Sequence, residues 1–288
     1  MLILKASALQ MRMGRFYEKR IPLGVAHRTK QKDLRLYMLV GGMPQAVNEY
    51  IGTNNLAKVD AVKRRIIKLY SDDFLKIDPT GKLSKLFMAI PAQLSKKATR
   101  FYTNAIVGEL GKKTEAEMLI NLEDSKAVLV SYHSDDPNVG MSLTKDVSKY
   151  KLFVADTGLF VTMVFWDNDF AENIIYQKLL ADKLEANLGY IYENLVAQML
   201  TAVGNKLFYY TFEKDEKHSY EIDFLLSRGN KICPIEVKSS GYKTHASLDA
   251  FRKKYSARIK NSYLLYTKDF QKGENELMYL PFYMAGMI

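Results

Sequence analysis

The chain has 288 residues, of which 48% are hydrophobic and 26% are charged. These proportions are ordinary for a folded globular protein and exclude a disordered chain. No apolar run approaches the ~18 residues that a membrane-spanning helix needs. The single cysteine, Cys233, excludes an internal disulfide and a multi-cysteine zinc site. Because the first ten residues also lack a secretory signal pattern, we expect a location in the reducing cytoplasm.

The net charge of +10 is unevenly distributed along the chain. Residues 1–100 hold 20 Lys and Arg against 7 Asp and Glu, whereas residues 101–200 hold 8 against 15. Residues 201–288 hold 14 against 10. An anionic partner is therefore expected at the first or the last third of the chain. A solvated lysine surface with no such partner is the alternative.

The first region, residues 1–80, is predicted to be helical. Between Leu56 and Leu75 the apolar residues recur with the spacing of one helix face. An earlier apolar segment, 34–40, ends at Gly41-Gly42-Met43-Pro44, where two glycines and a proline stop a helix and form a turn. The turn-forming residues 78–81 mark the boundary of this region.

The second region, residues 81–165, is predicted to be a winged helix. Helices are expected over 83–94, 101–110 and 115–122, and strands over 127–132 and 150–155. That order is typical of winged helices, whose third helix usually enters the major groove of DNA. Here the third helix carries Glu115, Glu117 and further acidic residues, which would repel phosphates. We therefore expect this region to be a packing module or a protein-contact module, and not a reader of DNA.

The third region, residues 166–288, is predicted to be a mixed α/β domain. A helix over 191–200 precedes strands over 207–212, 220–226 and 232–238. A second helix over 248–255 and a strand over 262–266 follow.

Three charged residues in these strands form the main candidate site. Glu236 and Lys238 share a strand face because they are two residues apart, and Asp223 lies inside an apolar run of the preceding strand. Two carboxylates on adjacent strands can bind Mg²⁺, and a nearby lysine can stabilise charge developing on a phosphate. Glu193, on the preceding helix, is within reach of the same site in this arrangement. A simple ion pair between Glu236 and Lys238 remains the alternative.

These residues resemble the motif set of PD-(D/E)xK nucleases, the superfamily of many restriction enzymes. The similarity rests on Glu193, on Ile222-Asp223-Phe224 and on Ile235-Glu236-Val237-Lys238, in matching element order. It implies that Asp223 and Glu236 are metal ligands for Mg²⁺, that Lys238 is the catalytic lysine and that Glu193 is an auxiliary acid.

A wider resemblance covers most of the chain. The segments 39–44, 151–159, 221–224 and 234–238 are similar to the C-terminal region of archaeal and bacterial AAA-type predicted ATPases. In that family an ATPase core is followed by a helical lid, a winged helix and a nuclease-like domain of unknown function. The resemblance therefore implies a multi-domain α+β protein with a lid-like region over 1–80, a winged helix over 81–165 and a PD-(D/E)xK restriction-endonuclease-like domain over 166–288.

The chain lacks the nucleotide-binding motif of that family. A P-loop needs G-x-x-x-x-G-K-[ST] after a strand, whereas the nearest run, 108–114, has different glycine spacing and a helical lead-in. We therefore expect the family's C-terminal part without its core, with no ATP site and no ATP hydrolysis by this chain alone.

Two interpretations of function remain open. In the first, the chain is a metal-dependent nuclease-like module that binds DNA through a basic face containing Arg252, Lys253 and Lys254. In the second, the nuclease fold is a non-catalytic scaffold in a regulatory module, and the winged helix binds a protein partner. No membrane partner is expected.

Overall fold

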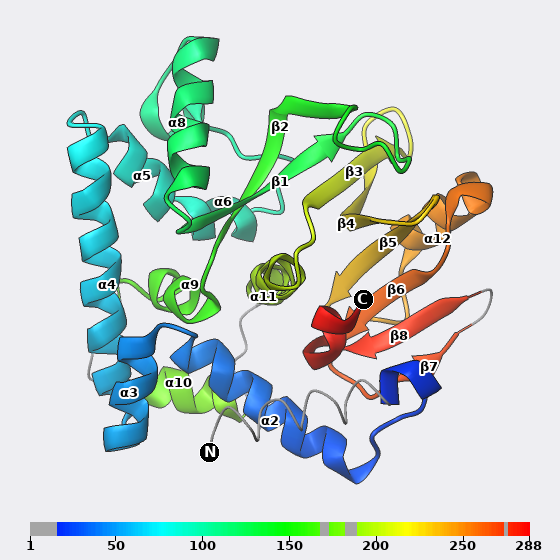
Figure 1. The fold of residues 1–288 in the computed structure, drawn as a ribbon, viewed down its shortest axis with the longest axis horizontal. Coiled ribbons are helices and arrows are strands. Elements are labelled where there is room, and N and C mark those ends of the chain that lie inside the picture. The colour runs from blue at the N-terminus through cyan, green and yellow to red at the C-terminus, as the bar shows by residue number, and fades with distance from the viewer. Residues whose placement is uncertain (1–15, 168–172, 182–188, 274–275) are drawn as a thin grey trace. The chain divides into compact units, whose positions relative to one another are not determined.

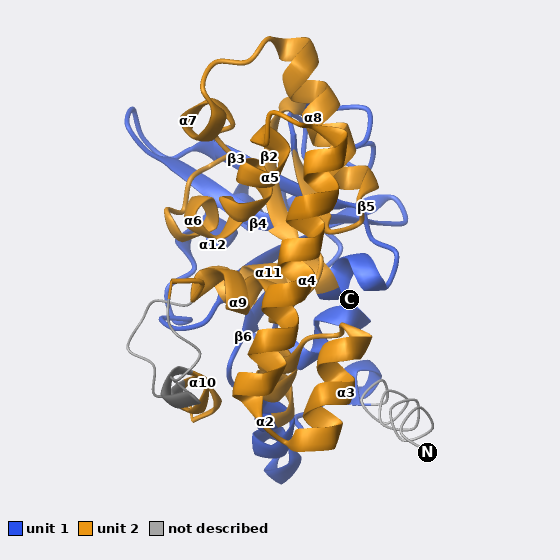
Figure 2. Ribbon diagram, turned by 90° about the vertical axis from the view of Figure 1, so that its left-hand side faces the viewer, with its two compact units in different colours: residues 1–32, 133–146, 199–288 blue, residues 33–132, 147–198 orange. Residues whose placement is uncertain are grey.

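The computed structural model describes residues 16–167, 173–181, 189–273 and 276–288 as an α+β protein with a mixed sheet (Figure 1). Two compact units divide the chain (Figure 2). Unit 1 comprises residues 1–32, 133–146 and 199–288, and unit 2 comprises residues 33–132 and 147–198. In the described ranges no helix is both long and apolar enough to cross a membrane. The three regions expected from sequence, together with the winged-helix and nuclease-like folds, stay predictions.

Most helices lie in unit 2, and four elements contribute residues to both units. The shared elements are α2 (Val25–Val40), β1 (Val128–Ser134), β2 (Lys145–Val154) and α11 (Gly189–Ala202). The helices inside unit 2 are α3 (Pro44–Thr53), α4 (Leu56–Ile77), α5 (Lys82–Met88), α6 (Ile90–Ser95), α7 (Asn104–Val107), α8 (Lys112–Asp124), α9 (Thr157–Val164) and α10 (Asn173–Leu180).

The long helix α4 confirms the helix expected from residue 56. Asn55 caps it, because its side-chain oxygen accepts hydrogen bonds from the N–H groups of Ala57 and Lys58. Its apolar stripe is buried and includes Val59, Ile67 and Phe74. Hydrophobic spacing thus predicts this helix and its buried face.

Two predicted helices of the second region are wrong in their extent. The segment 83–94 forms two short helices, α5 and α6, that meet at Ala89. Pro91, at the start of α6, has no N–H and its ring clashes with a preceding helical carbonyl, so one continuous helix cannot form. Over 101–110 only the single turn α7 is helical, and it ends at Gly108, whose φ is +78°.

Two glycine-containing segments far apart in sequence meet inside unit 2. The buried Asp156 caps α9 by accepting a hydrogen bond from the N–H of Leu159 at 2.8 Å, and its second oxygen accepts one from the N–H of Gly42 at 2.6 Å. A Cβ on Gly158 would lie 2.5 Å from the Cα of Gly41. The turn between α2 and α3 therefore fits against the start of α9 only because both sides lack a side chain.

Buried charges hold α4 to its neighbours in unit 2. Lys63 donates hydrogen bonds to the carbonyls of Leu39 at 2.6 Å and Gly158 at 3.2 Å. Asp60, one turn earlier, accepts hydrogen bonds from Arg64 at 2.7 Å, from Thr162 at 2.8 Å and from the hydroxyl of Tyr176. These contacts give partners to charges that would otherwise be strongly unfavourable in an apolar interior.

The sheet has the strand order β2-β1-β3-β4-β5-β6-β8-β7. Within unit 1 its strands are β3 (Leu207–Glu213), β4 (Ser219–Arg228), β5 (Lys231–Lys238), β6 (Ser262–Tyr266), β7 (Gln271–Lys272) and β8 (Leu277–Pro281). Strands β3, β4 and β5 are antiparallel, whereas β5, β6 and β8 are parallel. Helix α12 (Ala246–Lys254) connects β5 to β6, and a short helical segment (Phe282–Met287) follows β8. The strands and the helix predicted over 207–266 are confirmed.

Residues from the start of the chain pack on the end of unit 1's sheet. The carboxylate of Asp269, after β6, accepts hydrogen bonds from the N–H groups of Leu23 at 3.1 Å and Gly24 at 2.7 Å. Gln31 donates to the carbonyl of Thr267 at 3.0 Å. His27 Nδ1 lies 2.8 Å from the hydroxyl of Tyr283. Unit 1 is thus built from segments more than 200 residues apart.

Candidate active site

The candidate site lies where β4 and β5 separate. Their last paired residues are Phe224 and Ile235, and continuing that register would set Asp223 opposite Glu236. Instead, Asp223 Oδ2 accepts a hydrogen bond from the N–H of Val237 at 2.7 Å. The side chain thus takes the place of a backbone acceptor at the point where the ladder ends. Alternation along the strands puts Asp223 on the face opposite the buried Ile222 and Phe224.

Glu236 and Lys238 form an ion pair on β5. Lys238 Nζ lies 2.8 Å from Glu236 Oε1, and the side chain of Glu236 is 6% exposed against 32% for Lys238. The second oxygen, Glu236 Oε2, is buried and has no hydrogen-bond partner among the described residues. Because a buried carboxylate oxygen without a donor is unfavourable, this atom marks a place suited to a proton, a water or a cation.

The electrostatic surroundings of Glu236 favour its neutral form. Burial raises the pKa of Glu236 above its usual range, and the negative charge of Glu221 raises it further. The ion pair with Lys238 and the nearby His245 oppose this shift. The raised pKa agrees with an oxygen that lacks a compensating donor.

His245, Tyr279 and Asp249 complete the surroundings of the site and were not among the predicted site residues. His245 Nε2 lies 2.9 Å from the hydroxyl of Tyr279 on β8. His245 Nδ1 lies 2.8 Å from Asp249 Oδ2, close enough for an ion pair but outside hydrogen-bond geometry. The place of His245 just before α12 was visible in the sequence, but its contact with Tyr279 depends on the unpredicted strand β8.

The structure brings three of the four predicted site residues together. Asp223, Glu236 and Lys238 lie on the neighbouring ends of β4 and β5 in unit 1. Glu193 lies on α11 within unit 2, and its role as an auxiliary acid stays a prediction.

The donor set of Asp223 and Glu236 fits a hard divalent cation in part. Carboxylate oxygens are the ligands that Mg²⁺ takes, commonly one or two of them together with waters. The unpartnered Glu236 Oε2 fits this requirement, whereas Asp223 Oδ2 is engaged by the backbone of Val237. No group of three or more His, Cys, Asp or Glu side chains in the described part of the chain is arranged to hold a metal. A cation here would therefore depend on two carboxylates and water.

The predicted basic face divides into two parts. Arg252 and Lys253 line a groove beside α12, together with Lys260. Lys254 instead lies over the rings of Phe212 and Tyr255, with its Nζ 5.6 Å and 5.4 Å from their centroids. Lys254 therefore does not line the groove with Arg252 and Lys253.

Two protein-family models match the chain. Residues 31–169 match a domain of unknown function (DUF8612), and residues 188–284 match another (DUF4143). The second domain is commonly found in the C-terminal region of AAA-ATPase-like proteins. No curated protein and no solved structure matches the chain. The chain thus matches two models of domains of unknown function, and the second of these domains is associated with ATPase-like proteins.

Proposed function

We propose that unit 1 cleaves phosphodiester bonds in DNA, with Mg²⁺ held by Asp223 and Glu236. The observation that carries this proposal is the buried, unpartnered Glu236 Oε2 beside Lys238, at the point where β4 and β5 separate. The association of the DUF4143 domain with ATPase-like proteins is compatible with this activity but does not specify it.

Each of the three side chains has a distinct role in this proposal. Glu236 offers Oε2 to the cation, and Asp223 binds through its carboxylate while Oδ2 keeps β5 in place. A bound divalent cation supplies Lewis-acid polarisation of the scissile phosphate. Lys238 Nζ, on the partly exposed side of the pair, donates hydrogen bonds to the negative charge that develops on the phosphate.

The charge of the cation also changes the protonation of Glu236. Without a cation, burial raises the pKa of this carboxyl group. A neighbouring positive charge favours the ionised form and lowers that pKa again. Cation binding is therefore expected to release a proton and to strengthen as pH rises.

A second function is favoured by one specific contact. Asp223 Oδ2 is used to hold the Val237 N–H, so the carboxylate already has a structural role. In the alternative proposal, unit 1 is a non-catalytic scaffold in a regulatory protein, and the acidic α8 in unit 2 contacts a protein partner.

Cleavage and cation binding distinguish these two functions. Cleavage of branched, single-stranded and double-stranded DNA would be measured with Mg²⁺ or Mn²⁺ for the wild type, Asp223→Asn, Glu236→Gln and Lys238→Met. Glu216→Gln, which changes an exposed carboxylate of the same unit, is the matched control. The nuclease proposal predicts loss of cleavage in the three site variants and normal cleavage in the control.

Thermal unfolding supplies an independent test of the cation. Mn²⁺ should raise the Tm of the wild type and of Glu216→Gln relative to EDTA, and should leave Glu236→Gln unchanged. Absence of both cleavage and a Tm shift in the wild type would overturn the nuclease proposal and favour the scaffold. Cleavage that survives all three site substitutions would overturn the assignment of the residues.

A further inference from the structure

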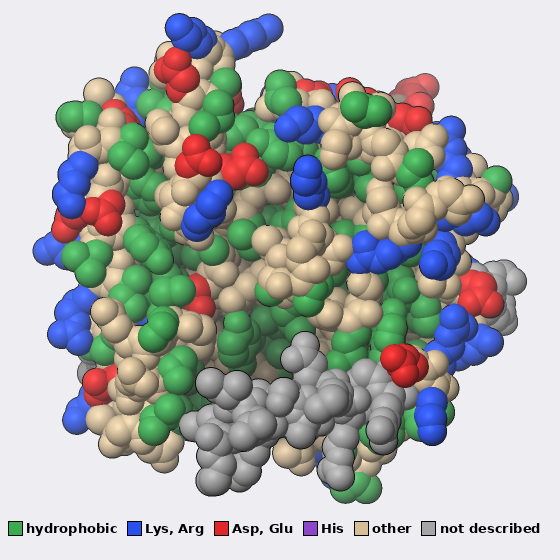
Figure 3. Space-filling model, viewed as in Figure 1, with side chains coloured by type: hydrophobic (Ala, Val, Ile, Leu, Met, Phe, Trp, Pro, Cys, Tyr) green, Lys and Arg blue, Asp and Glu red, His purple; other side chains and the backbone are tan. Residues whose placement is uncertain are grey.

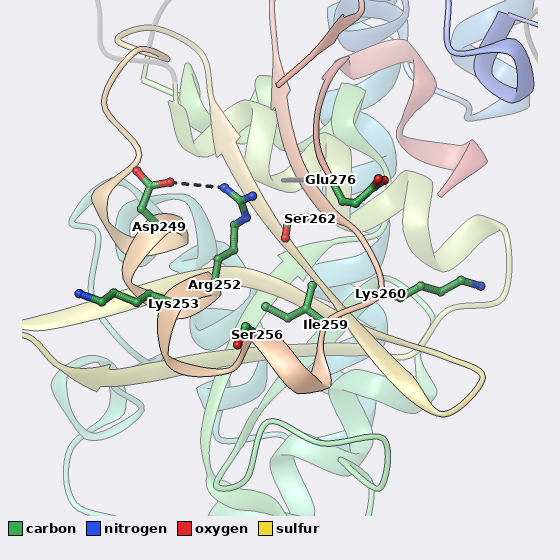
Figure 4. Close-up of a pocket in the computed structure, with 8 residues that line it drawn as sticks. All are labelled: Asp249, Arg252, Lys253, Ser256, Ile259, Lys260, Ser262 and Glu276. Atoms are coloured by element: carbon green, nitrogen blue, oxygen red, sulfur yellow. Dashed lines mark ion pairs between the residues drawn. The ribbon is translucent and has the colours of Figure 1, made fainter. Parts of the chain in front are cut away.

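A groove of about 580 Å³ lies beside α12 in unit 1 (Figure 4). The last turns of α12 form one wall through Arg252, Lys253 and the following Ser256. The segment that leads into β6 contributes Lys260 and Ser262. We call this feature the basic groove. Three cations and two hydroxyl groups are the side-chain types that bind phosphate oxygens in proteins.

Each of the two acidic residues of the basic groove lies close to a basic side chain: Asp249 to Arg252 of the groove itself, and Glu276 to Arg20. Asp249 lies 2.8 Å from His245 Nδ1 and 3.7 Å from Arg252 NH1. Glu276 pairs with Arg20 at 3.3 Å. By contrast, Lys253 and Lys260 are exposed, and no ion pair is formed by either within the part of the chain that the structure describes. The groove therefore retains positive charge that a ligand can neutralise.

The cations of the basic groove are spread out and do not converge on one point. In Figure 4, Lys253 and Lys260 extend toward opposite sides of the view, and Arg252 lies between them. Figure 3 shows several Lys and Arg side chains, with a few Asp and Glu side chains among them, on the right-hand side over the region of α12 and β6 to β8. A single phosphate would be held by converging donors, whereas a row of separated cations suits the repeated phosphates of a nucleic-acid strand.

The basic groove is connected to the candidate active site by α12. His245, at the start of this helix, contributes to the electrostatic surroundings of Glu236 and contacts Asp249. Asp249 contacts Arg252 one turn later. Consecutive turns of one helix thus carry the groups that surround Glu236 and the groups that line the groove.

We propose that the basic groove binds the backbone phosphates of the DNA strand whose cleavage is proposed above, on which this inference rests. Arg252, Lys253 and Lys260 contact successive phosphates, and the exposed hydroxyl group of Ser256 adds a hydrogen bond. Lys254 is not part of this surface, because it lies over Phe212 and Tyr255. Binding here positions a strand along α12 without reading its sequence.

Binding is tested separately from cleavage by fluorescence anisotropy in EDTA, with labelled single-stranded and double-stranded oligonucleotides. The test variant is the double substitution Lys253→Glu with Lys260→Glu. The control is Lys214→Glu with Lys217→Glu, which reverses two exposed charges on the β3–β4 loop of the same unit. The inference predicts that the test variant raises Kd by roughly 10-fold or more. It also predicts that the slope of log Kd against log salt falls by about 1 for each lysine, while the control stays near the wild type.

Two results would overturn the inference. The first is an equal change in Kd for the test and control variants, or no change for either. DNA would then bind through non-specific charge or at another surface. The second is tighter binding of a mononucleotide or inorganic phosphate than of the oligonucleotide in competition, which would assign the groove to a small phosphate ligand. If DNA binds as predicted but is not cleaved with Mg²⁺ or Mn²⁺, the nuclease proposal fails and the groove remains a DNA-binding surface.

Discussion

The two carboxylate oxygens of Glu236 have different surroundings. One oxygen is paired with a lysine, the other is buried without a donor, and burial raises its pKa. A residue kept only for stability would be expected to have both oxygens satisfied. The unsatisfied oxygen therefore argues for a ligand that completes the site.

The pH dependence of stability tests this description of Glu236. Because its folded-state pKa lies above the unfolded value near 4.5, the folded protein keeps the proton to higher pH than the unfolded chain. The free energy of unfolding that Glu236 contributes is fully present below the unfolded-state pKa. It is lost as pH rises through the folded-state pKa. Glu236→Gln should therefore gain stability relative to the wild type as pH rises from 4.5 to 8. Urea unfolding in EDTA measures this difference, and parallel curves for the two proteins would contradict the expectation.

Lys63 in unit 2 should make the stability of the protein depend on pH in the opposite direction. Burial lowers its pKa from 10.5 to about 8, although Asp60 and Asp156 partly offset the shift. Since the unfolded chain binds more protons between pH 8 and 10.5, the stability contributed by Lys63 rises with pH in that window. Lys63→Met leaves the carbonyls of Leu39 and Gly158 without this donor and should destabilise by about 1–3 kcal/mol at pH 7. The difference in free energy of unfolding between the wild type and Lys63→Met should be larger at pH 9.5 than at pH 7, as measured by urea unfolding. A smaller difference at pH 9.5 would refute the argument.

At the scale of elements, the close approach of α9 to the α2–α3 turn depends on glycine. A Cβ at position 158 would lie 2.5 Å from the Cα and 2.6 Å from the nitrogen of Gly41. Because those atoms are backbone, they cannot rotate away, and α9 would have to shift.

Gly158→Ala should therefore destabilise the protein by about 1–3 kcal/mol, the range for overpacking a filled site. Gly52→Ala is the matched control, because Gly52 lies in α3 and a Cβ added there would have no atom within 4 Å. That control should be neutral or more stable by up to about 0.5–1 kcal/mol, because alanine loses less backbone conformational entropy than glycine on folding. Equal effects on the urea midpoint would show that the contact with Gly41 does not matter.

The spacing of apolar residues predicts a helix or strand well where the buried residues recur with the period of that one structure. The strands β3 to β6 and helix α4 follow their apolar spacing, and Asp223, Glu236 and Lys238 were identified because strand alternation gives each a face. The single helix expected over 83–94 is wrong because apolar spacing alone does not take into account Pro91, which separates α5 from α6. Tyr279 could not be assigned to the site from sequence, since its contact with His245 depends on pairing between β6 and β8.

At the scale of the whole molecule, the matched domains and the compact units have different boundaries. The DUF4143 match covers residues 188–284, whereas unit 1 also includes residues 1–32 and 133–146. A fragment cut at the domain match would lose the hydrogen bonds that join Leu23, Gly24 and Gln31 to the segment after β6.

A fragment of residues 188–288 should accordingly be less stable than unit 1 in the full chain. The loop around Asp269 would lose its donors from the first segment, and its amide hydrogens should exchange with solvent faster. Hydrogen–deuterium exchange of the fragment and the full chain, compared over residues 262–283, measures this effect. Equal protection in both would show that the first segment contributes little to unit 1.

The discontinuous make-up of unit 1 also has a consequence for synthesis on the ribosome. Leu23, His27 and Gln31 are translated more than 230 residues before their hydrogen-bond partners Asp269, Tyr283 and Thr267. At about 5–20 residues per second, that interval is on the order of tens of seconds. During this time unit 2 can acquire all of its residues, while the first segment of unit 1 waits without its partners.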